Sequence, residues 1–227
     1  MQTLTPVTLR TCPLLDDDEL GRVNAQLESS SPADIVRWAH DRLGSRLALT
    51  ASFADTTLID IATSVAPDIE VIFLDTGFHF AETLNVVRRA MERYALNLTV
   101  VRPPAAADDV WSHGSDACCR ARKVDALDRH LDGRVAAWLS GVRRADSPER
   151  ADAPIVSIDR RGLVKVNPMA NMSDAEYEAY VLEHDVLVNT LQHDGYASIG
   201  CWPCTEPSDD GRSGRWGGTK TECGLHL

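Results

Sequence analysis

The sequence predicts an α/β fold built on a doubly wound, mostly parallel sheet. Three short apolar runs, residues 47–53, 70–74 and 97–102, have the length and composition of buried strands. Residues 55–65 and 80–94 separate these runs and have the pattern of helices. Strands that alternate with helices are typical of parallel sheets whose crossover connections are helical.

Further elements are predicted on both sides of this unit. Apolar positions recur at helical spacing in residues 16–27 and 31–43. Ser31 followed by proline is typical of a helix N-cap with proline in the first turn. The later predicted elements are a loop at 105–117, a helix at 118–131, a strand at 134–139, a hairpin with strands 155–158 and 163–166, a helix at 174–184 capped by Ser173, and a short helix near 186–193.

The composition indicates a single globular domain with an appendage. The 227 residues are 44% hydrophobic, and no internal repeat or low-complexity linker marks a boundary. We therefore expect one domain at residues 1–204 and a tail at 205–227. Residues 205–218 are rich in Gly, Ser, Asp and Arg, which favours a mobile arm over a packed element.

Charge and hydropathy exclude several function classes. The formal charge of −11 argues against bulk binding of nucleic acid. No run approaches the roughly 20 apolar residues that a membrane span needs. Residues 1–13 hold one charge and lack the hydrophobic segment of a signal peptide, so we expect a cytoplasmic protein with no membrane partner.

Three polar turns follow predicted strands. Each alone is typical of an ordinary helix start, but the carboxyl ends of neighbouring parallel strands form one crevice. Backbone N–H groups at such helix starts suit a phosphate. The candidate substrate contacts there are Ser52 and Asp55 in the first turn, Leu74, Asp75, Thr76 and Gly77 in the second, and Gly141, Arg143 and Arg144 in the third.

Six cysteines include two pairs with metal-site character. Cys118 and Cys119 are adjacent, and Cys201 and Cys204 form a Cys-x-x-Cys turn. Four thiolates suit zinc or an iron–sulfur cluster, and the predicted helix start at Cys118 favours the thiolate form. Neighbouring side chains diverge, so the adjacent pair favours a cluster over one tetrahedral ion. We expect Cys12 to be a buried structural thiol.

Basic residues follow these cysteines closely. Such a concentration in an acidic chain predicts a local anion pocket beside the metal site, although solvated surface charge is the simpler account of some members. The residues concerned are Arg120, Arg122, Lys123, Arg212 and Arg215, together with Arg143 and Arg144 after the fourth strand.

The motifs closely resemble the iron–sulfur adenylyl-sulfate (APS) reductases of the phosphoadenylyl-sulfate (PAPS) reductase family. The resemblance covers about residues 47–227. It rests on Leu74-Asp75-Thr76-Gly77-x-His79-Phe80-x-Glu82-Thr83, Cys118-Cys119-x-x-Arg122-Lys123, Trp138-x-x-Gly141-x-Arg143-Arg144, Lys165-Val166-Asn167-Pro168, Ser198-Ile199-Gly200-Cys201-x-Pro203-Cys204-Thr205, Arg212-x-Gly214-Arg215-Trp216 and Glu222-Cys223-Gly224-Leu225-His226.

The resemblance implies a fold related to the PP-loop ATP pyrophosphatases and a specific reaction. The iron–sulfur members reduce APS to sulfite and AMP, hold a 4Fe–4S cluster through the two cysteine pairs, and take electrons from thioredoxin. The family also suggests a homo-oligomer. The four paired cysteines favour APS over PAPS as the substrate.

The same resemblance assigns roles to individual residues. Cys223 is expected to attack the sulfur and form an S-sulfocysteine, with His226 placing the tail or assisting proton transfer. Lys123, Arg212 and Arg215 are expected to neutralise the sulfate oxygens. Either Arg143 or Arg144 would hold the α-phosphate, and adenine would lie near residues 74–77.

Some features depart from the family, and three alternatives stay open. Residues 50–57 lack the glycines of a PP-loop, and Met172 stands where the family often has tryptophan. A PAPS reductase is the first alternative. A zinc-stabilised nucleotide-binding protein with an inert Cys223 is the second. A PP-loop sulfur transferase acting on tRNA is the third, and the acidic charge and missing glycines count against it.

Overall fold

A six-stranded sheet organises the computed structural model, which describes residues 15–104, 111–208, 211–220, 222 and 224–225. The strand order is β3-β2-β1-β4-β6-β5. All neighbours are parallel except β5 and β6, which form an antiparallel hairpin. The strands are β1 (Leu47–Ala51), β2 (Glu70–Leu74), β3 (Asn97–Val101), β4 (Ala137–Leu139), β5 (Val156–Ile158) and β6 (Val164–Val166).

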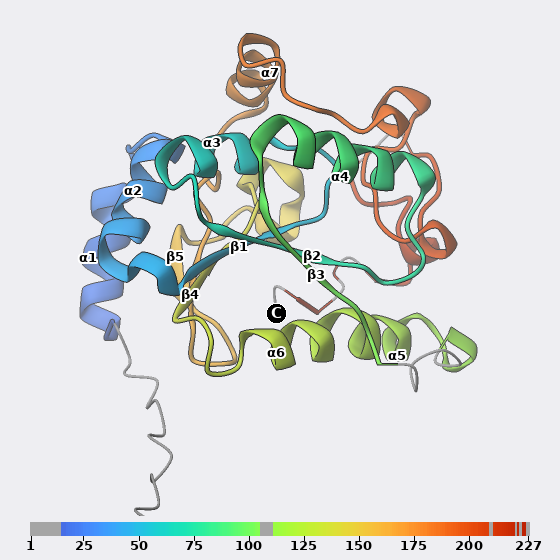
Figure 1. The fold of residues 1–227 in the computed structure, drawn as a ribbon, viewed down its shortest axis with the longest axis horizontal. Coiled ribbons are helices and arrows are strands. Elements are labelled where there is room, and N and C mark those ends of the chain that lie inside the picture. The colour runs from blue at the N-terminus through green and yellow to red at the C-terminus, as the bar shows by residue number, and fades with distance from the viewer. Residues whose placement is uncertain (1–14, 105–110, 209–210, 221, 223, 226–227) are drawn as a thin grey trace, which may run out of the picture.

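Helices cover both faces of the sheet, so the predicted doubly wound architecture is confirmed. Figure 1 shows α3 and α4 on one face and α5 and α6 on the other. Among the described residues the α-helices are α1 (Asp17–Leu27), α2 (Pro32–Leu43), α3 (Thr57–Val65), α4 (Ala81–Tyr94), α5 (Ser115–Cys119), α6 (Asp125–Leu131) and α7 (Asp174–Glu183). None of these is long and apolar enough to cross a membrane.

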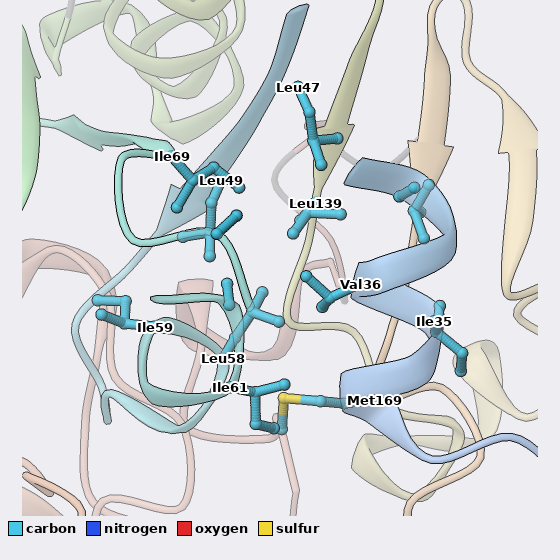
Figure 2. Packing of buried hydrophobic residues seen from close by; sticks show 14 of the residues in the cluster. Ile35, Val36, Leu47, Leu49, Leu58, Ile59, Ile61, Ile69, Leu139 and Met169 are labelled. Atoms are coloured by element: carbon cyan, nitrogen blue, oxygen red, sulfur yellow. The ribbon is translucent and has the colours of Figure 1, made fainter. Parts of the chain in front are cut away.

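Alternation along the strands divides the buried side chains into two cores. In β2, Val71 and Phe73 belong to a large cluster with α1 to α4, whereas Ile72 and Leu74 belong to a smaller cluster with α6. This follows because successive side chains of a strand point to opposite faces. Figure 2 shows the large cluster, in which strand residues such as Leu49 meet residues of α2 and α3.

The predicted helix caps are confirmed. Ser31 accepts a hydrogen bond from the N–H of Asp34 at 3.2 Å, with proline at the first position of α2. Ser173 and Glu176 form a reciprocal capping box at the start of α7. These side chains satisfy backbone donors that have no partner within the helix.

Several predicted bounds are wrong. The first strand ends at Ala51 rather than residue 53, because the backbone of Phe53 has a left-handed φ of 57°. The fourth strand covers only Ala137–Leu139. In place of a helix near 186–193, Val188 pairs with Asp55 as an isolated bridge, and a 3₁₀-helix covers Thr190–Asp194.

The predicted helix at 118–131 is made of three pieces. It begins earlier, at Ser115, and its middle segment, Arg120–Val124, is π-helical. The N–H of Asp125 bonds to the carbonyl of Arg120, five residues earlier. Such wide turns are uncommon and occur often at functional sites.

Candidate functional site

The carboxyl ends of three neighbouring strands open onto one cavity of about 510 Å³. Strands β2, β1 and β4 are adjacent in the sheet, so the turns that follow them lie side by side. The cavity extends from these turns to the C-terminal segment, because Arg212, Arg215, Glu222 and Leu225 also line it. Its wall is therefore assembled from segments far apart in the sequence.

The structure brings most of the predicted substrate contacts to this cavity. Those that line it are Ser52, Asp55, Leu74, Lys123, Gly141, Arg143, Arg212 and Arg215. Those that do not line it are Asp75, Thr76, Gly77 and Arg144.

The turn after β2 mainly faces away from the large cavity. One carboxylate oxygen of Asp75 accepts from the N–H of Gly77 at 3.1 Å, and the other accepts from Nε of Arg102 at 3.0 Å. Thr76 Oγ1 lies 3.2 Å from Sγ of Cys201. Asp75 thus stabilises the turn itself, and Thr76 belongs to the surroundings of the cysteines.

The two cysteine pairs lie around a second, small cavity of about 10 Å³. Cys118 and Cys119 reach it from α5, and Cys201 and Cys204 reach it from the turn that contains a short 3₁₀-helix, Trp202–Cys204. All four side chains are buried. The fold therefore brings together the four thiols that the sequence predicts to act as one ligand set.

Burial and mutual proximity disfavour the thiolate forms of Cys118 and Cys204. Burial, together with the nearby thiols of Cys119 and Cys201, raises the pKa of Cys204 to about 11. The same causes raise the pKa of Cys118. Cys118 is the fourth residue of α5, so it remains near the helix start that is expected to favour its thiolate, and burial of the thiol acts against that effect. Metal binding would have to displace these protons.

The donor set fits a group held by sulfur. Four buried thiols that share one cavity are suitable ligands for zinc or for an iron–sulfur cluster. Among the residues that the structure describes, no three His, Cys, Asp or Glu side chains are grouped so as to hold one metal ion. Analysis of the bound element separates the zinc and cluster alternatives.

The Cys201–Cys204 turn is fastened to the loop after β2. The N–H of Trp202 donates to the carbonyl of Phe78 at 2.8 Å, and His79 pairs with Cys201 as an isolated antiparallel bridge. His79 also lines the large cavity, and its Nε2 lies 2.9 Å from the carbonyl oxygen of Leu74. Burial lowers the pKa of His79, and the charge of Lys123 lowers it further.

Lys123 is the cation that both cavities share. It belongs to the lining of the large cavity and to that of the cysteine cavity. The neighbouring Arg122 is buried instead, where it donates to the carbonyl of Thr76 at 2.8 Å and lies 4.5 Å from the ring centroid of Phe78. Both residues line the cysteine cavity, but only Lys123 also lines the large cavity.

Arg212 and Arg215 approach the large cavity around the ring of Trp216. Their guanidinium carbons lie 5.5 and 4.4 Å from its centroid. Arg215 Nη1 donates to Ser198 Oγ at 3.0 Å. Arg215 and Trp216 are 4% and 6% exposed, so the expectation of an unpacked arm does not hold for this part of the tail.

The structure distinguishes Arg143 from Arg144. Arg143 lines the large cavity, where its side chain contacts Asp146, Asp174 and the ring of Tyr177. Arg144 points toward α1 and forms a two-pronged ion pair with Glu28. The hydrogen bond to Glu28 raises the pKa of Arg144 above its ordinary value.

Three charged residues that line the cavity, Asp146, Arg150 and Glu222, were not assigned to the site from the sequence. Arg150 lines it and donates from Nε to Glu222 at 2.7 Å. Burial opposes the charge of Arg150, but Glu222 and Asp146 outweigh this and raise its pKa. The only sequence signal for Glu222 was its place next to Cys223, whereas Arg150 lies in a polar loop with no distinctive pattern.

The predicted catalytic residues Cys223 and His226 lie outside the described residues. Glu222 and Leu225, which directly precede them, are described and belong to the cavity wall. Leu225 packs against the smaller hydrophobic core, and Glu222 contacts Arg150 and Arg212. The C-terminal segment is therefore placed at the large cavity on both sides of position 223.

Comparisons with known proteins agree with the motifs. Residues 46–207 match the family model described as the phosphoadenosine phosphosulfate reductase domain. The chain is 40% identical to adenosine 5′-phosphosulfate reductase of Mycolicibacterium smegmatis over 89% of this chain and 91% of that protein. It is likewise 40% identical to the protein of that name from Streptomyces coelicolor, over 90% of this chain and 92% of that protein.

Solved structures show the same architecture. A phosphoadenylyl-sulfate reductase from Candida auris superimposes with a TM-score of 0.75 at 27% identity, covering 85% of this chain and 98% of that one. FMN adenylyltransferase of Candida glabrata superimposes with a TM-score of 0.59 at 12% identity, covering 86% of this chain and 70% of that one. The second likeness concerns the fold alone.

Proposed function

Because this chain belongs to the phosphoadenosine phosphosulfate reductase family, we propose that it reduces adenylyl sulfate to sulfite and AMP in sulfate assimilation, with thioredoxin as electron donor. The observation that carries the proposal is the position of Lys123, which lines both the large cavity and the cysteine cavity. The nucleotide would occupy the large cavity, with its sulfate end directed toward Lys123.

The cations of the large cavity would reduce the electrostatic repulsion between the attacking thiolate and the sulfate group. A thiolate has to approach a sulfur whose oxygens carry negative charge. Lys123, Arg212 and Arg215 line the cavity from the side of the cysteine site and of the tail. They would neutralise the sulfate oxygens and stabilise the charge that develops on the departing phosphate. Arg143 or Arg150 would hold the α-phosphate.

Cys223 is proposed as the nucleophile. Its thiolate attacks the sulfur, the bond between sulfur and the bridging phosphate oxygen breaks, and AMP leaves with the electron pair. One thiolate of thioredoxin then attacks the Cys223 sulfur and releases sulfite, leaving a mixed disulfide. The second thioredoxin thiol resolves this disulfide, so the dithiol supplies both electrons. His226 is proposed to place the tail or assist proton transfer.

Cys118, Cys119, Cys201 and Cys204 are proposed to hold a 4Fe–4S cluster. The shared cavity and burial of these thiols support this, as does the adjacency of the first two. A bound cluster would supply a polarising charge beside Lys123 rather than the electrons of the reaction. Iron and acid-labile sulfide in protein purified without air would support it, and zinc in their place would contradict it.

Sulfite release from equal low concentrations of APS and PAPS tests the substrate. A preference for APS is expected, and a preference for PAPS would contradict it. Cys223→Ser should abolish sulfite release and prevent formation of a sulfo-adduct detectable by mass spectrometry. Survival of activity in this variant would overturn the proposed mechanism. The homo-oligomer suggested by the resemblance stays a prediction, tested by light scattering.

A further inference from the structure

The carboxylate of Glu222 pairs with two arginines, Arg150 and Arg212, in the wall of the large cavity. Arg150 Nε donates to one carboxylate oxygen at 2.7 Å, and Arg212 Nη2 lies 3.4 Å from the other. The side chains of Glu222, Arg150 and Arg212 are 11%, 12% and 14% exposed. These three side chains form a largely buried ionic cluster in a cavity whose cations could instead bind an anionic ligand.

Two more charged side chains, Asp146 and Lys165, lie close to the Glu222–Arg150–Arg212 cluster. Asp146 accepts from Arg150 Nη1 at 2.9 Å. Lys165 is 8% exposed, and burial together with the charge of Arg150 lowers its pKa, whereas Glu222 acts in the opposite direction. Removal of the Glu222 carboxylate would leave closely spaced cations poorly compensated, so another anion should replace it.

We propose that Glu222 is a positioning residue that competes with the phosphosulfate group of the substrate for Arg150 and Arg212. This inference deepens the proposed function and rests on it. Two anions at the same guanidinium groups repel each other, so arrival of the substrate exchanges the internal carboxylate for the external anion. Glu222 directly precedes Cys223 in the C-terminal segment, so the exchange takes place next to the proposed nucleophile.

The opposite side of this segment has a different kind of anchor. Leu225 packs against a core cluster that includes Leu74 and Leu127. Gly224 has a left-handed φ of 86° and would place a Cβ 3.6 Å from Val124 Cγ2. Glu222 thus makes an ionic contact that an anion can replace, whereas Leu225 makes an apolar contact that an anion does not disturb.

Calorimetric titration of the full-length holoenzyme with AMP and with inorganic sulfate tests the exchange. In Glu222→Gln both ligands should bind about tenfold tighter, because binding no longer has to replace a carboxylate or overcome its repulsion of the incoming anion. The KM for adenylyl sulfate should fall by a similar factor. A merely structural role would weaken binding instead. Glu222→Ala should show the same direction of change.

Glu19→Gln is the matched control. Glu19 pairs with Arg42 at 2.5 Å between α1 and α2, with side chains 33% and 37% exposed, and neither residue lines the large cavity. The Glu19→Gln protein should bind AMP and sulfate with the same affinities as the unaltered protein.

Unchanged or weaker binding of AMP and sulfate by both Glu222 variants would overturn the proposal. Ligand affinity tests the exchange, and sulfite release tests the proposed function, so failure of one can be told from failure of the other. Sulfite release with no affinity change contradicts only the exchange. Tighter binding in a protein that releases no sulfite contradicts only the reductase activity.

Discussion

The guanidinium group of Arg215 lies against the backbone of Gly200, so closely that a Cβ on this glycine would stand 2.1 Å from Nη2. Gly200 directly precedes Cys201, and Arg215 lines the large cavity. The absence of a side chain at position 200 therefore makes room for a cation of the site. The backbone angles of Gly200 do not require glycine, since its φ is not positive.

Gly200→Ala should displace Arg215 from the cavity. We expect sulfite release to fall about a hundredfold, as for the loss of one donor to developing charge. Overpacking should also lower the free energy of unfolding by about 1–3 kcal/mol. Initial-rate kinetics and denaturant unfolding measure the two effects.

Gly21→Ala is the control for this substitution. Gly21 lies within α1, and a Cβ there would meet nothing within 4 Å. It should raise stability by roughly 0.5–1 kcal/mol through helix propensity and leave activity unchanged. Normal kinetics in Gly200→Ala would show that Arg215 can shift without loss of function.

Lys123→Ala removes the cation shared by the two cavities. We expect kcat/KM for adenylyl sulfate to fall about 10²- to 10³-fold, because transition-state charge loses a nearby positive group. Iron and sulfide content should stay the same, because Lys123 is not a ligand. Loss of the metal in this variant would mean that its main role is structural.

Arg143→Ala and Arg144→Ala should separate binding from stability. Arg143 lines the cavity, so its loss should raise KM about tenfold, equivalent to about 1.4 kcal/mol. Arg144 pairs with Glu28 outside the cavity, so its loss should lower stability by about 1 kcal/mol with a much smaller effect on KM. The reverse pattern would assign phosphate binding to Arg144.

Asp128 gives the fold a pH-dependent contact between α6 and the β5–β6 hairpin. Burial opposes its ionised form, but hydrogen bonds from Arg160 and Arg161 outweigh burial and lower its pKa. A lowered carboxyl pKa stabilises the folded state above the ordinary value, and this stabilisation is lost as pH falls through the lowered pKa.

Asp128→Asn should therefore cost about 1 kcal/mol at pH 7, and the difference from the unaltered protein should disappear as pH falls below about 4 and through the lowered pKa. Urea unfolding across this range measures it. Asp68→Asn, at an exposed turn, is the control and should show little difference at any pH. A pH-independent cost for Asp128→Asn would assign the effect to packing rather than to the ion pairs.

Most of the fold could be predicted because its signals are local. The run at residues 70–74 is bounded in the structure as the pattern indicates, and Ser31 and Ser173 cap the helices that follow them. The left-handed backbone of Phe53 and the π-helical turn at Arg120–Val124 depend on packing between distant segments. No local sequence pattern encodes them.

The functional site likewise has some features that local sequence patterns reveal and others that only the fold reveals. The two cysteine pairs could be recognised by their spacing, and they share a cavity. Arg150 could not be recognised, because its partner Glu222 lies 72 residues away and its own loop resembles ordinary surface. Arg143 and Arg144 are adjacent and chemically identical, so only the fold reveals which one lines the cavity.

The π-helical turn at Arg120–Val124 determines the directions in which the side chains of α5 and α6 face relative to each other. Each residue advances an α-helix by about 100°, and a π-helical turn uses about one residue more for the same rotation, so a regular α-helix of the same length would turn everything beyond this point by about that angle. Upstream of the turn, Cys118 and Cys119 face the small cavity, while downstream Leu127 and Leu131 face the sheet. A regular α-helix with the same number of residues would put these two orientations out of phase. The π-helical turn thus absorbs one extra residue, so that one helix can serve the ligand set and the hydrophobic core together.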